Sequence, residues 1–270
     1  MPMDGRVQWE GHKFVIGGVT FQSINTLLDL YTLEDADGYI VGKLKSFIDR
    51  YVSVLADLQD ANVIELGVFR GGSTVFLNEL MRPKRLAAVD IATELPPLLG
   101  RYIKESPRAG AIRPYMGMDQ SSLPDLERIC TDFMAGEPID AVIDDASHFY
   151  DETKASFEFL FPRLRPGGLY VIEDWGWANQ RIEASVIAPH LAGRKAMSNL
   201  IFEILLAASA APEIFPLVEV NSDFVVVHRG AAAIPAPFRL GDYCFYGGKP
   251  LGSTEFFSPP PAPAARDDRG

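Results

Sequence analysis

The apolar and polar positions of residues 61–174 follow two alternating patterns. Short apolar runs are typical of buried β-strands, and the longer segments between them carry apolar residues at helical spacing. Strand and helix alternate along this region, which predicts a parallel sheet covered by helices on both faces. The predicted strands are 61–66, 86–89, 111–116, 139–143 and 169–172, and the predicted helices are 73–82, 98–106, 121–135 and 151–164.

The two flanks of this region follow other patterns. Residues 12–22 predict a β-hairpin, and apolar residues at helical spacing predict a helix within 35–58. Residues 200–211 predict a further helix, and 217–227 predict a second hairpin that gives the sheet an antiparallel last strand. We therefore divide the chain into an N-terminal hairpin and helix (1–60), the sheet unit (61–230), a C-terminal extension (231–257) and a Pro- and Ala-rich tail interpreted as disordered (258–270).

Composition narrows the class of protein. The hydrophobic fraction of 47% and the charged fraction of 23% are ordinary for a globular chain, so a mostly disordered protein is excluded. The 25 Lys and Arg against 36 Asp and Glu give a net charge of −11, which argues against nucleic acid as the main partner. Two cysteines, no signal-peptide pattern and no apolar stretch long enough for a bilayer predict a cytoplasmic protein without membrane contact. The amphipathic N-terminal helix could also pair subunits of a homo-oligomer.

A glycine-rich turn follows the first strand of the sheet unit. Glycines at Gly67 and Gly71 permit a tight turn and a close approach of the backbone to a ligand, and Ser73 is a plausible N-cap of the next helix. Glu65 would repel a pyrophosphate, so the turn suits a cationic ligand, although a strand-to-helix turn without a ligand stays open. Asp90 ends the neighbouring strand, where a carboxylate can accept the two hydroxyls of a ribose.

Further acidic residues follow the next two strands. Asp144 and Asp145 end one strand, and Glu173 and Asp174 end the other. The carboxyl ends of parallel strands meet at one edge of a sheet, so these carboxylates should converge and repel each other unless a cation such as Mg²⁺ lies between them. His148 follows closely and could accept a proton near neutral pH. The alternative without a metal is that these carboxylates lie in a solvated loop and cap the helix that follows.

Together these motifs resemble a class I S-adenosylmethionine-dependent methyltransferase. Residues 63–73 resemble its glycine-rich first motif, and residues 86–90 its second. Within that class, residues 140–148, with Asp-Asp-Ala-Ser-His, and residues 164–174, with Pro-Gly-Gly and Glu-Asp, resemble the macrolide-sugar O-methyltransferases of mycinamicin and tylosin biosynthesis and the related cephalosporin hydroxylase-like proteins. The resemblance covers roughly residues 60–230 and implies a Rossmann-like sheet.

The resemblance also implies cofactors, an acceptor and residue roles. S-adenosylmethionine and Mg²⁺ would be the cofactors, a hydroxyl of a small molecule such as a sugar would accept the methyl group, and His148 would be the general base. Either Asp144 or Asp145 could face the metal. The implied cofactor-binding residues are Glu65, Gly67, Gly71, Ser73, Asp90, Asp119, Gln120 and Asp144, and the implied metal ligands are Asp145, Glu173 and Asp174.

Other functions remain compatible with the sequence. Residues 175–199 contain Trp175 and Trp177, whose flat faces could cover a sugar or an aromatic ring. A metal-independent methyltransferase would rely on His148 alone. A nicotinamide-dependent oxidoreductase would share the acid after the second strand but not the glycine spacing. A binding protein without catalysis would tolerate the loss of His148.

Overall fold

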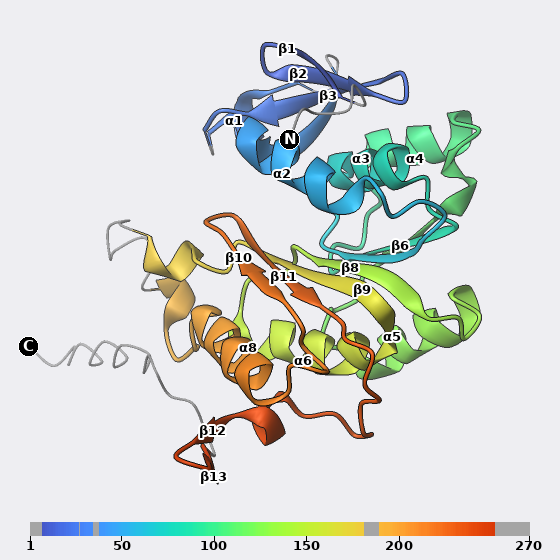
Figure 1. The fold of residues 1–270 in the computed structure, drawn as a ribbon. Helices are drawn as coiled ribbons and strands as arrows, with labels where there is room; N and C mark the ends of the chain where they lie inside the picture. The colour runs from blue at the N-terminus through green and yellow to red at the C-terminus, as the bar shows by residue number, and fades with distance from the viewer. Residues whose placement is uncertain (1–6, 27, 35–37, 181–188, 252–270) are drawn as a thin grey trace, which may run out of the picture.

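Figure 1 shows the computed structural model of the chain, whose structure is described for residues 7–26, 28–34, 38–180 and 189–251. Within these ranges no helix is both long and apolar enough to cross a membrane. Both cysteine thiols are free and buried. The tail over 258–270, interpreted from the sequence as disordered, lies outside the described residues.

A seven-stranded sheet lies at the centre of the molecule (Figure 1). Its strands are β5 (Asn62–Leu66), β6 (Arg85–Asp90), β7 (Ile112–Met116), β8 (Ile139–Asp144), β9 (Leu164–Glu173), β10 (Val218–Val220) and β11 (Phe224–His228). They lie in the order β10-β11-β9-β8-β5-β6-β7. Strands β5 to β9 are parallel to their neighbours among themselves, whereas β11 runs antiparallel to β9 and β10 antiparallel to β11. This arrangement confirms the predicted fold class.

Helices cover both faces of this sheet (Figure 1). They are α2 (Lys45–Leu55), α3 (Gly72–Met81) and α4 (Pro97–Glu105) on one face, and α5 (Leu123–Arg128), α6 (Tyr150–Leu160) and α8 (Ser198–Ala210) on the other. Neighbouring residues of one strand enter different cores: Val63 packs with the first set of helices and Ile64 with the second. Burial on both faces explains why these strands are continuous apolar runs rather than alternating ones.

Short elements connect and extend these layers. The C-terminal extension adds a two-stranded sheet. The elements are the 3-10 helices η2 (Ala109–Ala111), η4 (Phe161–Arg163), η5 (Trp177–Asn179) and η6 (Leu240–Tyr243), the π-helix η3 (Ile129–Phe133), and the strands β12 (Phe245–Tyr246) and β13 (Lys249–Pro250).

The N-terminal unit is a four-stranded sheet with α2. Its elements are β1 (Gln8–Glu10), β2 (Lys13–Ile16), β3 (Val19–Ile24), α1 (Asp29–Thr32) and β4 (Tyr39–Leu44). The antiparallel pairing of β2 with β3 confirms the predicted hairpin. The helix predicted within 35–58 is wrong in its first part, because residues 39–44 form β4, parallel to β3. Tyr39, Ile40 and Val41 favour a strand, and pairing with β3 prevailed over the helical spacing.

Three local predictions in the sheet unit need correction. Ser73 is not the N-cap of α3, because Gly71 takes that position with a left-handed φ of 82°. The strand predicted over 169–172 begins earlier, at Leu164, so Gly167 and Gly168 lie inside β9, whose register against β8 shifts around them. The helix predicted over 151–164 ends at Leu160, and Pro162 lies in the 3-10 helix η4 that follows it.

Candidate active site

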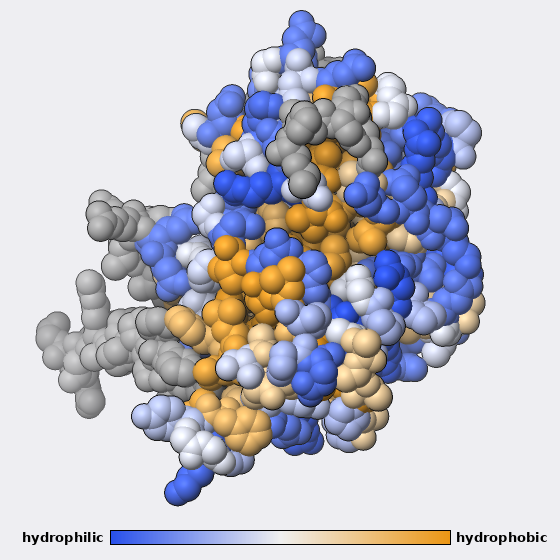
Figure 2. Space-filling model, in the orientation of Figure 1, coloured by the Kyte–Doolittle hydropathy of each residue, from blue (hydrophilic) through white to orange (hydrophobic). Residues whose placement is uncertain are grey.

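A cavity of about 700 Å³ opens at the carboxyl ends of the central strands. Its lining includes the turn after β5, the end of β6, residues that directly follow β7, β8 and β9, and parts of α1 and β4. Strand order reverses at β5, which lies between β6 and β8, and α/β sheets bind ligands at such a point. In Figure 2 apolar residues gather across the middle of the face shown in Figure 1. The volume of the cavity is within the range that is typical of small-molecule binding sites.

The glycine-rich turn requires glycine where the chain approaches the next strand. Gly67 has a φ of 94°, and a Cβ there would lie 2.0 Å from the backbone oxygen of Asp145. A Cβ on Gly72 would lie 2.0 Å from the backbone oxygen of Ile40 in β4. Ser73 also lines the cavity, whereas Gly71, the N-cap of α3, does not. The turn therefore packs between the end of β8 and the N-terminal unit.

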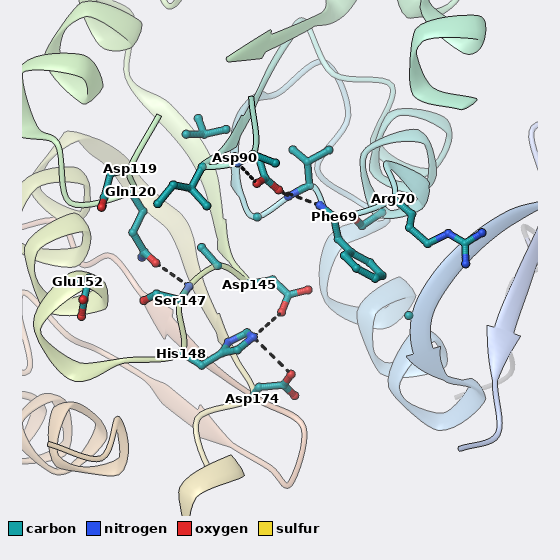
Figure 3. Close-up of a pocket in the computed structure, with 18 of the residues that line it drawn as sticks. Phe69, Arg70, Asp90, Asp119, Gln120, Asp145, Ser147, His148, Glu152 and Asp174 are labelled. Carbon is teal, nitrogen blue, oxygen red and sulfur yellow. Dashed lines mark hydrogen bonds and ion pairs between the residues drawn. The ribbon is translucent and has the colours of Figure 1, made fainter. Parts of the chain in front are cut away.

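Asp90 lines the cavity and holds the glycine-rich turn in place. Its Oδ2 accepts the backbone N–H groups of Val68 at 2.8 Å and Phe69 at 2.9 Å, and its Oδ1 accepts that of Ala92 at 2.8 Å. Phe69 and Ile91 are exposed and line the cavity beside it. Figure 3 shows Asp90 directed at the turn. The carboxylate thus shapes the cavity wall, and a role toward a ribose stays a prediction.

Glu65 is buried behind this wall rather than in it. Its side chain is 1% exposed, and its Oε2 accepts the Thr74 hydroxyl at 2.6 Å. Its Oε1 is buried and has no hydrogen-bond partner within the described part of the chain. Burial raises the pKa of Glu65 to about 7, against the hydrogen bonds from Ser73 and Thr74 that lower it. An acceptor oxygen without a donor, close behind a cavity, is the kind of group that a ligand donor satisfies.

Asp119 and Gln120 form the wall after β7, as Figure 3 shows. Asp119 is exposed, and its Oδ1 accepts the backbone N–H of Ser121 at 2.7 Å. Gln120 is buried, and its amide oxygen accepts the backbone N–H of Ser147 at 2.8 Å. Gln120 therefore ties this wall to the loop that carries His148.

Asp144 lies below the cavity and supports Gln120. Its carboxylate accepts hydrogen bonds from the Gln120 amide at 3.0 Å, the Ser156 hydroxyl at 2.9 Å and the Tyr170 hydroxyl at 3.0 Å. Its side chain is 2% exposed, and burial raises its pKa to about 6. Asp144 does not line the cavity, so it can act on a ligand only through Gln120.

Asp145, His148 and Asp174 form an open cluster at the cavity. Nε2 of His148 lies 3.9 Å from Oδ1 of Asp145 and 3.9 Å from Oδ2 of Asp174, and one atom from each of the three residues lies within 4.8 Å of the others. Their side chains point toward one another (Figure 3). His148 and Asp174 have left-handed φ values of 56° and 50°, an uncommon backbone conformation for residues other than glycine. The structure thus directs Asp145, not Asp144, into the cluster.

Glu173, the third predicted metal ligand, does not line the cavity. Its carboxylate is 2% exposed, receives a hydrogen bond from the Tyr51 hydroxyl and pairs with Nζ of Lys43 at 2.7 Å. Lys43 also pairs with Oδ2 of Asp145 at 2.8 Å. Burial lowers the pKa of Lys43, but attraction to the two carboxylates outweighs burial and raises it above its ordinary value. Glu173 is therefore linked to the cluster through Lys43.

Phe149 forms an aromatic wall next to the cluster. The guanidinium carbon of Arg194 lies 4.0 Å from the centre of its ring, and Arg194 pairs with Glu152 at 3.2 Å. Trp177 packs on Phe149 at 5.9 Å and donates its indole N–H to the backbone oxygen of His148 at 2.8 Å. Neither Trp177 nor Trp175 lines the cavity, so the predicted tryptophan cover is replaced by Phe149 with Trp177 behind it.

The N-terminal unit contributes residues to the site that the sequence does not predict. Leu30, Ile40, Gly42 and Lys43 all line the cavity. Lys43 follows an apolar run, which is unusual for a solvated lysine, but no pattern in the sequence connects it to Asp145, 102 positions away.

The chain is similar to known methyltransferases over part of its length. Residues 64–175 match the family of methyltransferase domains. Demethylmacrocin O-methyltransferase of Streptomyces fradiae is 62% identical over 37 residues, which are 14% of this chain and 9% of that protein. Mycinamicin VI 2''-O-methyltransferase of Micromonospora griseorubida is 50% identical over 56 residues, which are 21% of this chain and 13% of that protein.

A solved structure extends the likeness to most of the fold. The MycE methyltransferase of the mycinamycin biosynthetic pathway, solved in complex with Mg and SAH, matches with a TM-score of 0.52 and 25% sequence identity. The match covers 78% of this chain and 56% of the MycE chain, so this chain spans little more than half of that relative. The chain is therefore similar to methyltransferase domains over residues 64–175 and has an α/β fold like that of MycE, and within this group it resembles the macrolide O-methyltransferases named above.

Proposed function

We propose that the protein transfers the methyl group of S-adenosylmethionine to a hydroxyl of a small molecule, such as a sugar of a natural product, and that it requires Mg²⁺. The observation that carries this proposal is the convergence of Asp145, His148 and Asp174 in a cavity beside the glycine-rich turn. We expect the two carboxylates to hold the ion and the imidazole to accept the proton of the same acceptor hydroxyl.

The cofactor proposal rests on the turn after β5 and the residues around it. Gly67 of this turn and Ser73 at the start of α3 line the cavity. Glu65 lies behind them with its Oε1 unpartnered among the described residues, and we expect its carboxylate to attract a cationic group in the cavity, such as the ammonium group of a methionine. Asp90, Asp119 and Gln120 line the cavity further along, where the ribose and the adenine would lie.

The metal proposal rests on the donor set. Carboxylate oxygens are preferred ligands of Mg²⁺, and Asp145 and Asp174 offer them to one point. Glu173, which is buried and paired with Lys43, is the third residue whose negative charge we propose to favour binding of the ion. When bound, S-adenosylmethionine supplies the methyl group and Mg²⁺ lowers the free-energy cost of negative charge on the acceptor oxygen.

His148 is the proposed general base. Its Nε2 faces the two carboxylates of the cluster, and its backbone oxygen is fixed by the indole N–H of Trp177. A neutral imidazole in this position can take the proton of an acceptor hydroxyl. Phe149, on the adjacent wall, offers an apolar face that orients the acceptor and excludes water from the cluster.

The test is methyl transfer from deuteromethyl S-adenosylmethionine to a panel of rhamnosyl and related 6-deoxyhexosyl glycosides, followed by mass spectrometry. We expect a product heavier by one deuteromethyl group, lost on chelation and restored by Mg²⁺. Turnover that persists in excess chelator would instead support the metal-independent enzyme. Thermal stabilisation by NAD but not by S-adenosylhomocysteine would reject the methyltransferase in favour of the oxidoreductase.

A further inference from the structure

Lys43 is a buried cation that the N-terminal unit inserts into the proposed metal site. It lies on β4, its side chain is 7% exposed, and its Nζ bridges Asp145 at 2.8 Å and Glu173 at 2.7 Å. The rings of Phe47 and Tyr51 lie 5.2 Å and 6.0 Å from Nζ and fix its position. A tethered ammonium therefore occupies one side of the carboxylates that we propose to act on the ion.

The charges around Lys43 are mostly negative. Besides its two direct partners, it interacts electrostatically with Glu65, behind the glycine-rich turn, and with Asp174, in the open cluster. Asp145 uses Oδ2 for Lys43, which leaves Oδ1 directed toward His148. The two carboxylate oxygens of Asp145 thus face different partners: Oδ2 faces Lys43 of the N-terminal unit, and Oδ1 faces His148 of the open cluster.

We propose that Lys43 sets the charge of the metal site, a positioning role that rests on the proposed function. Ion binding requires deprotonated carboxylates, and in that form Asp145, Glu173 and Asp174 contribute three negative charges. The single ammonium of Lys43, which pairs with two of them, reduces the sum to −2, which matches one divalent ion. Without Lys43 the site would keep one negative charge after the ion had bound. That charge would strengthen ion binding and oppose negative charge on the acceptor oxygen.

Two opposite effects of one substitution follow from this role. Lys43→Met should tighten divalent binding at least tenfold, because it removes a positive charge a few ångströms from the ligands. The same change should lower turnover at saturating metal. If Lys43 only stabilised the fold, its replacement by methionine would not tighten binding of the ion.

The experiment is a titration with Mn²⁺ of the chelator-treated full chain, saturated with S-adenosylhomocysteine, with free Mn²⁺ followed by electron paramagnetic resonance. We expect at least tenfold tighter binding for Lys43→Met, and changes below about threefold for Lys43→Arg, which keeps the charge, and for Tyr51→Phe, which removes a neutral donor to Glu173. Asp174→Asn should weaken binding at least tenfold.

Unchanged or weaker Mn²⁺ binding by a folded Lys43→Met protein overturns the inference but leaves the proposed enzyme intact. If that variant does not fold, Lys43→Met is made in a Glu173→Gln background, where no buried carboxylate loses its charge partner at Glu173. There it should again tighten binding at least tenfold relative to Glu173→Gln alone, and no tightening overturns the inference. Absence of Mn²⁺ binding by the unmodified protein overturns both the metal dependence and this role.

Discussion

Asp144 and Asp145 are adjacent in the sequence but lie in two different regions of the molecule. Asp144 is 2% exposed, and its carboxylate accepts hydrogen bonds from Gln120, Ser156 and Tyr170. Asp145 is 25% exposed; its Oδ2 pairs with Lys43 at 2.8 Å, whereas its Oδ1 lies 3.9 Å from His148. Successive residues at the end of a strand point to opposite faces of the sheet. One therefore enters the core beside α6, and the other enters the cavity.

This difference in environment indicates that Asp144 supports the structure, whereas Asp145 is available to a ligand. A carboxylate whose acceptors are satisfied by fixed donors is held rigidly and has little left to offer a ligand. A carboxylate with an open oxygen beside a histidine and a second aspartate is suited to bind a cation or to orient a base. We infer that the buried region fixes the loop carrying His148, while the open cluster acts on the substrate.

The largest expected effect comes from the open cluster. His148→Ala should lower the rate of methyl transfer about 10²- to 10⁴-fold, since it removes the proposed base, while affinity for S-adenosylhomocysteine stays unchanged. Steady-state rates and calorimetric titration measure the two quantities. His228→Ala is the matched control, because His228 pairs with Glu219 at the opposite end of the sheet. Equal losses in both variants would remove His148 from the mechanism.

The second prediction concerns the close packing of the glycine-rich turn on Asp145. Gly67→Ala should lower the free energy of unfolding by about 3 kcal/mol or more, because the added Cβ would overlap the backbone oxygen of Asp145 at an unfavourable φ. Gly18→Ala, at a φ of 87° with nothing within 4 Å, isolates the backbone cost of roughly 1 to 2 kcal/mol. Urea denaturation of both variants gives the comparison, and similar values would show that the contact is not tight.

The third prediction uses the raised pKa of Glu65. Its folded pKa of about 7 exceeds its ordinary value of 4.5, so between these values the folded state keeps a proton that the unfolded state has lost. Stability from this group is therefore fully present below pH 4.5 and falls, by up to about 3 kcal/mol, as the pH rises to 7. Glu65→Gln should flatten that part of the pH profile of urea denaturation. A profile of unchanged slope would mean that Glu65 titrates normally.

The smallest effect should come from the buried region. Asp144→Asn places an amide among three donors and should lower the free energy of unfolding by about 1 to 3 kcal/mol. Mn²⁺ affinity should stay within about threefold of the unmodified protein, whereas Asp145→Asn should weaken it at least tenfold while affecting stability less. The reverse pattern, with metal binding lost only in Asp144→Asn, would exchange the roles of the two residues.

The sequence predicts the sheet and the convergence of acids at its edge, because both follow from local patterns. Apolar runs and turn signals are sufficient for β5 to β9, and parallel strands bring their carboxyl ends together. Which of Asp144 and Asp145 faces the cavity does not follow, because β8 is buried on both faces and shows no alternation. The contribution of the N-terminal unit to the site cannot be predicted from local sequence patterns either. Lys43 reaches Asp145 only because β4 pairs with β3 and packs on the turn at Gly72, and both contacts are long-range.

The most direct test is calorimetric titration of S-adenosylhomocysteine into chelator-treated protein, repeated with Mg²⁺ present. We predict saturable binding in both buffers and a separate saturable Mg²⁺ signal that disappears in Asp145→Asn. Binding of S-adenosylhomocysteine without any response to Mg²⁺ would contradict the metal site and leave His148 as the sole catalytic group. No binding in either buffer would contradict the assignment of the cavity to a methyltransferase.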